Sequence, residues 1–200
     1  MVIGLPKLPI PDKICEVCLF GKQPRNAYSS YLPMTTSNVL NVIHSNVCGP
    51  FEVPSLGGKK YFTSFVDEYS RMMWLYLIKS KDEVLSSFKK FRVMIEKQCR
   101  IAIKILWTDG GKEYTSKAFK FNCEKHGILH EVTAPYTPQH NELVERINRT
   151  ILEMARSMME HKDLPHSFQG EVISTTTYLL NRCLTKRLKK KVLSLEGNLW

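Results

Sequence analysis

Two acidic residues, Asp109 and Glu145, stand where a site for phosphoryl transfer could be built. Transfer or hydrolysis of a phosphodiester needs a nucleophilic oxygen and a stabilised leaving oxygen, and two Mg²⁺ ions about 4 Å apart can hold both. Mg²⁺ prefers oxygen ligands, usually one or two carboxylates together with waters and substrate phosphates. Asp109 and Glu145 fall in different predicted elements, with 35 residues between them. Carboxylates that converge from separate elements suit this chemistry.

Each of these residues also has a purely structural interpretation. An Asp before Gly-Gly, as at Asp109, is most often a turn residue, because Asp favours turns and Gly adopts positive φ. A Glu near a helix N-terminus, as at Glu145, is most often a solvated residue that the helix dipole favours. The pair therefore needs support from the surrounding sequence.

The hydrophobic pattern predicts the elements that would position this pair. Three antiparallel strands joined by short turns are expected first, and two more strands follow between helices. The predicted strands cover residues 39–44, 61–66, 72–78, 101–107 and 128–132. The predicted helices run from a capping box at Ser80 and Glu83 to residue 98, from Ser116 to Gly127, over 139–160 and over 167–182. This order predicts an α/β fold, a mixed five-stranded sheet flanked by helices.

Sites in such domains form at strand ends and helix starts. The pattern places Asn46 at the end of the first strand and Asp109 at the end of the fourth. Glu145 falls on the first turns of the long helix. These positions are where a site would be expected.

The composition indicates a basic globular protein. The 200 residues are 43% hydrophobic, and 29 Lys and Arg against 19 Asp and Glu give a net charge of +10. A soluble chain this basic most often binds a polyanion such as nucleic acid, although many basic proteins do not. No signal peptide is recognised in residues 1–13, and no apolar run approaches the ~18–20 residues that a membrane span needs. The six cysteines are therefore expected to be reduced, inside the cell.

Several ordered blocks resemble the catalytic core of retroviral-type integrases, specifically those of copia-type retrotransposons. The matching stretches are HSNVCGP (44–50), FVDEYSR (65–71), TDGGKEY (108–114), YTPQHN (136–141), VERINRT (144–150) and YLLNR (178–182). The resemblance covers about residues 13–191. It implies an RNase H-like fold, an Asp-Asp-Glu site for Mg²⁺ or Mn²⁺, and 3′-processing and strand transfer of DNA ends.

The resemblance assigns the metal-binding roles residue by residue. Asp109 matches the second Asp of the family, and Glu145 matches its closing Glu. The first Asp falls at position 46, where this chain has Asn. Asn46 offers a neutral carbonyl oxygen and an NH₂ donor in place of an anion. We therefore expect metal affinity and catalysis to be strongly reduced. Asp67, also acidic, does not match a metal position and is expected to be structural.

Two loops also depart from the family pattern. The family usually has Asp-Asn-Gly where this chain has Asp109-Gly110-Gly111, and Asn-Gly where this chain has Asn141-Glu142. Glu142 is expected to stiffen its loop and to place an anion near substrate phosphates.

Four residues around Glu145 are candidates for DNA contacts: Gln139, Asn141, Arg146 and Arg149. Arg149 lies four residues after Glu145, so both side chains fall on one helix face. The alternative is a solvated helix face, which we prefer for Arg156.

Cys15-x-x-Cys18 has a redox, a zinc-binding and an incidental interpretation. The thioredoxin-like context that a redox pair needs is absent. In the family this pair completes a His-His-Cys-Cys zinc knuckle, but the first His of this chain is His44, downstream. A structural zinc site needs four ligands. We do not expect this chain alone to hold Zn²⁺.

The resulting domain prediction has three parts. Residues 1–38 form a linker with the remnant of a zinc knuckle, 39–184 the RNase H-like catalytic core, and 185–200 a basic, divergent tail. The tail segment Lys186–Lys191 is interpreted as a DNA contact, a nuclear address or a solvated tail.

Three functional hypotheses remain open: an active integrase or nuclease, a DNA-binding module with an inactive site, and a remnant without function. The family implies DNA as partner, both element ends and target, and a homo-oligomer. It places the chain in the nucleus or the cytoplasm, with no membrane contact.

Overall fold

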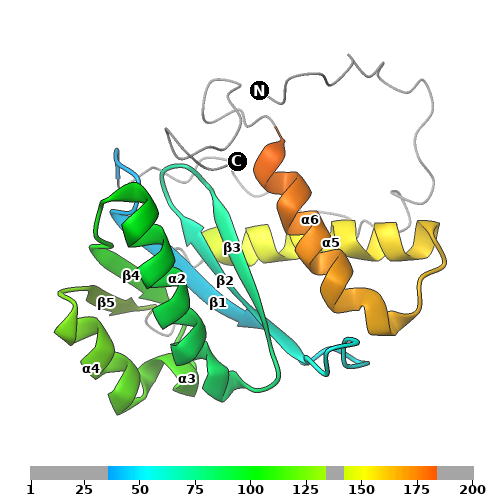
Figure 1. The fold of residues 1–200 in the computed structure, drawn as a ribbon, viewed down its shortest axis with the longest axis horizontal. Coiled ribbons are helices and arrows are strands. Elements are labelled where there is room, and N and C mark those ends of the chain that lie inside the picture. Colours follow the sequence, from blue (N-terminus) through cyan, green and yellow to red (C-terminus); the bar gives the residue numbers. More distant parts are fainter. Residues whose placement is uncertain (1–35, 134–141, 184–200) are drawn as a thin grey trace.

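The computed structural model describes residues 36–133 and 142–183 (Figure 1). They form one mixed five-stranded sheet in the order β3-β2-β1-β4-β5. The first three strands are antiparallel neighbours, and β4 and β5 run parallel to β1. The strands are β1 (Val42–Cys48), β2 (Tyr61–Asp67), β3 (Met73–Ile78), β4 (Ile105–Thr108) and β5 (Leu129–Val132). The predicted mixed sheet of five strands is confirmed.

Helices cover both faces of this sheet (Figure 1). Three of them, α2 to α4, pack on one face, and α5 and α6 pack on the other. The helices are α2 (Val84–Cys99), α3 (Lys112–Thr115), α4 (Lys117–Lys125), α5 (Glu142–His161) and α6 (Gln169–Arg182), with 3₁₀ turns η1 (Lys81–Glu83) and η3 (His166–Phe168). No helix in the described ranges is both long and apolar enough to span a bilayer.

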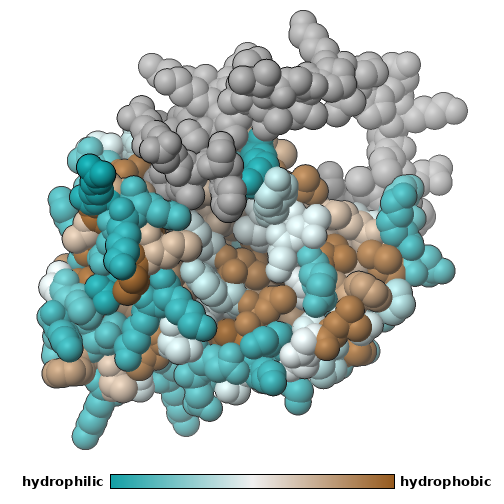
Figure 2. All heavy atoms as spheres, in the orientation of Figure 1, coloured by the Kyte–Doolittle hydropathy of each residue, from teal (hydrophilic) through white to brown (hydrophobic). Residues whose placement is uncertain are grey.

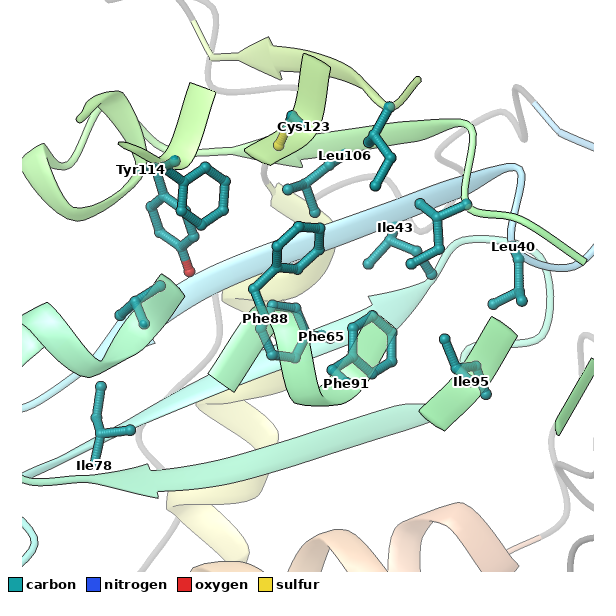
Figure 3. Close-up of a cluster of buried hydrophobic side chains, with 14 residues drawn as sticks. Leu40, Ile43, Phe65, Ile78, Phe88, Phe91, Ile95, Leu106, Tyr114 and Cys123 are labelled. Atoms are coloured by element: carbon teal, nitrogen blue, oxygen red, sulfur yellow. The ribbon is translucent and has the colours of Figure 1, made fainter. Parts of the chain in front are cut away.

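Alternation along the strands produces two separate cores. On β2, Phe65 faces the α2–α4 side, whereas Phe62 and Val66 face the α5–α6 side. The ring of Phe65 stacks on Phe91 with centroids 4.5 Å apart, and both are fully buried (Figure 3). Hydrophobic side chains also reach the surface between the sheet and α6, whereas hydrophilic ones predominate over α2–α4 (Figure 2).

The loop that leaves β1 depends on a glycine. Gly49 has φ of +124°, and a Cβ there would lie 2.7 Å from the carbonyl oxygen of Lys60. The chain then turns back, because the N–H of Phe51 donates to the same Lys60 oxygen at 2.6 Å. This close contact holds the end of β1 against the start of β2.

Several predicted boundaries were wrong by a few residues. The first strand begins at Val42 and continues to Cys48, so Asn46 lies inside it and does not end it. The fourth strand begins at Ile105, not at residue 101. The short helix α3 was missed, since four residues carry no helical period.

The capping box at Ser80 and Glu83 was also wrong. The Ser80 side chain makes no capping hydrogen bond, and the turn η1 separates it from α2. The Glu83 carboxylate instead accepts from the N–H of Lys79 at 3.3 Å. By contrast, the predicted Ser116 cap is present, because its Oγ accepts from the N–H of Phe119 at 3.3 Å. Gly127, with φ of +65°, follows α4 as predicted.

Candidate active site

One end of the sheet gathers the residues that the sequence singled out. Because β1 and β4 are parallel and Ser45 pairs with Thr108, the next residues, Asn46 within β1 and Asp109 just after β4, lie side by side. The antiparallel pairing of Asn46 with Ser64 brings β2 to the same place. The register between β1 and β4 thus brings positions 46 and 109 next to each other.

Strand alternation shows which face of the sheet carries the site. Ser45 Oγ lies 2.7 Å from the hydroxyl of Tyr114, on the side of α2–α4. Asn46 therefore faces the opposite side, together with Cys48, which packs in the core beneath α5 and α6. This is the face on which α5 carries Glu145.

A buried hydrogen bond positions the start of α5 over this point. Ser64, the cross-strand partner of Asn46, donates from Oγ to Oδ1 of Asn148 at 2.9 Å. Asn148 is three residues after Glu145, close to one helical turn. Glu145, on the first turn of α5, is itself exposed, and its charge acts on Cys48 at the end of β1.

The pKa of the Cys48 thiol depends on the charges of both candidate carboxylates. The pKa of Cys48 is raised to about 11, mainly because the thiol is buried, while the hydrogen-bonding side chain of Asn148 acts in the opposite direction. The negative charges of Asp109 and Glu145 each contribute to this rise. Both carboxylates therefore act on one point at the end of β1. Sequence reasoning did not single out Cys48, Ser64 or Asn148, although Cys48 and Asn148 lie within the blocks quoted above.

Asp109 is held in a tight, half-buried loop. Burial raises the pKa of its carboxyl, and a hydrogen bond from the N–H of Gly111 to Oδ1, at 3.1 Å, lowers it. The carboxylate of Glu113 raises the pKa, and the ammonium group of Lys81 lowers it. Asp109 thus belongs to a local charge group with Glu113 and Lys81 that the sequence analysis did not recognise.

Comparison with known proteins supplies the family. Residues 38–138 match the family model of the integrase core domain. The chain belongs to the integrase core domain family. It is 47% identical over 170 residues, 85% of its length, to the Retrovirus-related Pol polyprotein from transposon TNT 1-94 of Nicotiana tabacum. It is 31% identical over 188 residues, 93% of its length, to the Pol polyprotein from transposon RE2 of Arabidopsis thaliana.

A more distant relative is the Truncated transposon Ty1-A Gag-Pol polyprotein of Saccharomyces cerevisiae, 26% identical over 184 residues, or 90% of this chain. The chain spans 13% to 15% of the length of these relatives. The predicted copia-type relationship is confirmed, and the mixed sheet with flanking helices is consistent with the RNase H-like fold expected of an integrase core.

The donor set of this integrase core fits one hard divalent cation better than two. Asp109 and Glu145 supply two carboxylates, and Asn46 supplies only a neutral amide oxygen. Within residues 36–133 and 142–183, no group of three His, Cys, Asp or Glu side chains is placed to hold a metal ion. Two carboxylates suffice for one Mg²⁺ whose remaining ligands are waters and phosphates. Their combined negative charge is smaller than the positive charge of two such ions.

The arginines near Glu145 differ in their surroundings. Arg146 is paired with Glu142, four residues earlier on α5. The Glu142 carboxylate thus partly neutralises one predicted DNA contact. Arg149 is exposed on the same helix. Gln139, Asn141, Cys15 and Cys18 lie outside the described residues.

Asp67 is structural, as expected. It pairs with Ile43 at the end of the sheet remote from Asp109. Its carboxylate accepts from the N–H of Leu40 at 2.7 Å and from the N–H and hydroxyl of Ser70 at 2.7 and 2.6 Å. Burial nevertheless raises its pKa. This carboxylate ties the segment before β1 to the β2–β3 turn.

A cavity of about 730 Å³ adjoins the site at Cys48. Phe62 and Leu152 form part of its apolar lining, and Arg156 and Glu160 of α5 contribute charges. Arg156, predicted to be merely solvated, is exposed but also borders this cavity.

Proposed function

We propose that this integrase core is a DNA-binding domain whose site has the architecture for metal-dependent phosphoryl transfer but is impaired by Asn46. The proposal is supported by the strand register that places Asn46 beside Asp109, with Glu145 in the first turn of the helix that covers the same face of the sheet. Asn46 and Asp109 follow a paired position of β1 and β4, and the charges of Asp109 and Glu145 both act on Cys48. The net charge of +10 favours a polyanionic partner.

Asp109 and Glu145 are the residues that would hold Mg²⁺ or Mn²⁺, with the Asn46 carbonyl oxygen as a weaker donor. A bound divalent ion supplies charge stabilisation for a phosphodiester undergoing displacement. The chain's own contribution is to hold the carboxylates: Gly111 fixes Asp109 by a 3.1 Å hydrogen bond, and Ser64 fixes α5 through Asn148. With Asn at position 46, the site carries one negative charge fewer than an Asp-Asp-Glu site, which weakens its hold on dications.

The same site supports a second candidate, a nucleic-acid-binding module without catalysis. Asn46 and the Glu142–Arg146 pair favour it, because one removes a metal-binding charge and the other neutralises a basic side chain beside Glu145. For both candidate functions the proposed partner is DNA, either the ends of the transposable element or the target DNA. The family also makes a homo-oligomer the expected assembly.

Restoring the acid tests the proposal. The unmodified chain, Asn46→Asp and the control Asn41→Asp are compared for strand transfer in Mg²⁺ or Mn²⁺ and for broadening of NMR signals by Mn²⁺. Asn41 precedes β1, so the control adds the same charge at the other end of the strand. We expect tighter Mn²⁺ binding and a gain of activity only in Asn46→Asp. Robust transfer by the unmodified chain would disprove impairment by Asn46. A restored chain that binds Mn²⁺ but stays inert would favour the non-catalytic module.

A further inference from the structure

A lysine is fixed next to Asp109 by a carboxylate from another element. Lys81 lies in η1, directly after β3, and its Nζ is 3.0 Å from Oε1 of Glu113 on α3. The two residues are 32 positions apart in sequence. The charges of Lys81 and Asp109 influence each other's pKa, so the ammonium group lies close to the proposed site.

The anchor of this lysine is rigid. The Glu113 side chain is only 5% exposed, and a Cβ at Gly111 would lie 2.7 Å from its carboxyl carbon. The next residue, Tyr114, is fully buried, and its hydroxyl lies 2.7 Å from Ser45 Oγ and 3.3 Å from Thr63 Oγ1. Tyr114 therefore pins α3 to the strands that carry the site, and Figure 3 shows its hydroxyl end directed toward the sheet.

The ammonium group itself remains open to a ligand. The Lys81 side chain is 51% exposed, and one of its three donors is directed at Glu113. The hydrogen bond to Glu113 raises the pKa of Lys81, so the group stays cationic through the physiological range. A lysine held in place on one side and open on the other has less conformational freedom to lose on binding.

Other lysines extend this feature along the same end of the sheet. Lys79 and Lys60 are exposed, and the N–H of Lys60 donates to the carbonyl oxygen of Ile78 at 3.0 Å, which places both beside the end of β3. Lys59 lies at the same end of the sheet, where it is paired with Glu83 at 3.4 Å. Asp82 is an exposed acid in the same turn, so the surface is cationic but not uniformly so.

We propose that Lys81, with Lys79 and Lys60 beside it, contacts backbone phosphates of the nucleic acid that occupies the Asp109–Glu145 site. The strand then crosses the β2–β3 end of the sheet, away from the Arg146 and Arg149 face of α5. A phosphate is the ligand that this arrangement fits, because a protonated amine does not bind metal and presents its donors as a point charge. The inference rests on the proposed DNA binding and adds the path that the nucleic-acid strand takes across the protein surface.

Salt dependence of DNA binding tests this path without requiring catalysis. Binding of a short labelled DNA duplex is measured over a range of salt concentrations for the unmodified chain, Lys81→Gln, Lys81→Arg and Lys104→Gln. Lys104 is an exposed lysine just before β4, at the opposite end of the sheet, so its replacement makes the same charge change. Each lost phosphate contact lowers the slope of log K against log salt by about 1.

We expect Lys81→Gln to weaken binding several-fold and to lower the slope by about 1, while Lys81→Arg and Lys104→Gln keep the original slope. Thermal unfolding of each variant shows whether the fold is retained. If Lys81→Gln lowers only thermal stability, or matches Lys104→Gln in slope, Lys81 is a structural ion-pair residue and the inference is wrong. If the unmodified chain itself shows no salt-dependent binding, the proposed DNA binding is wrong, and so is the proposed phosphate contact at Lys81.

Discussion

The Ser64 hydroxyl on β2 donates a 2.9 Å hydrogen bond to the side-chain carbonyl of Asn148 on α5, and both residues are buried. The bond links two elements 84 residues apart. It lies where the cross-strand partner of Asn46 meets the helix turn after Glu145. This contact, together with the apolar packing of α5, holds the helix that carries Glu145 against the strand beside Asn46.

Loss of this contact should destabilise the domain. Asn148→Ala leaves the Ser64 hydroxyl buried without its partner, and we expect it to lower the free energy of unfolding by about 1–3 kcal/mol. Urea denaturation of Ser64→Ala, Asn148→Ala and the double variant gives the coupling, expected near 1 kcal/mol. Additive effects of the two single substitutions would show that the hydrogen bond does not couple α5 to the sheet.

The Cys48 thiol should be a slow nucleophile whose reactivity depends on the site carboxylates. With a pKa of about 11, it stays protonated at pH 8 and should be alkylated far more slowly than the exposed Cys183. Because the charges of Asp109 and Glu145 raise this pKa, Asp109→Asn and Glu145→Gln should each lower it and speed alkylation. Mass spectrometry of iodoacetamide-treated peptides over a pH series measures each cysteine separately.

Two controls define that experiment. Asp82→Asn removes an exposed acid from η1 and should leave Cys48 alkylation unchanged. Cys183 in the same samples reports any general change in reagent or fold. If neither Asp109→Asn nor Glu145→Gln changes the pH dependence of Cys48 alkylation, the two carboxylates do not both lie near the end of β1.

The sequence names candidate residues for the site but not their geometry. Asp109 and Glu145 stand out from residue type and block, and the neutral residue at position 46 is visible without coordinates. The pairing of Ser45 with Thr108 is a matter of strand register, which apolar alternation alone does not specify. The Lys81–Glu113 pair escapes prediction because it joins the 3₁₀ turn η1 to the short helix α3, and the two residues are 32 positions apart. Local periodicity carries no information about such a contact.

Asp109 should decrease the stability of the folded chain at neutral pH. Burial raises its pKa, so the folded state disfavours the ionised carboxylate relative to the unfolded state. This destabilisation is present above the folded pKa and disappears as the pH falls below the unfolded value of about 3.9. We expect Asp109→Asn to raise the free energy of unfolding at pH 7 by less than about 1 kcal/mol, because solvent screens a partly exposed carboxylate.

The pH dependence separates this effect from a change in packing. Chemical denaturation of the unmodified chain and Asp109→Asn between pH 3 and 7 should show a difference that shrinks toward acid. Asp82→Asn, an exposed control, should change stability by less than about 0.5 kcal/mol at every pH. A constant difference across the range would attribute the effect of Asp109→Asn to hydrogen bonding with Gly111 and not to charge.

The two glycines after Asp109 should respond very differently to alanine. A Cβ at Gly111 would lie 2.7 Å from the carboxyl carbon of Glu113, whereas a Cβ at Gly110 would meet nothing within 4 Å. Gly111→Ala must therefore displace Glu113, which frees Lys81 and disturbs the loop that holds Asp109. Gly110→Ala should leave all three residues in place.

We expect Gly111→Ala to lower the free energy of unfolding by only about 1 kcal/mol, because the clash falls on the end of the Glu113 side chain, which can move, and Gly110→Ala to change it by less than about 0.5 kcal/mol. Thermal and urea unfolding measure the stability, and the salt slope of DNA binding measures the loss of the Lys81 contact. Because Glu113 is the anchor of Lys81, a Gly111→Ala variant that folds but keeps the unmodified slope would separate phosphate binding from this anchor. Equal effects of the two alanines would instead indicate that the loop is set by glycine flexibility and not by the buried Glu113 carboxylate.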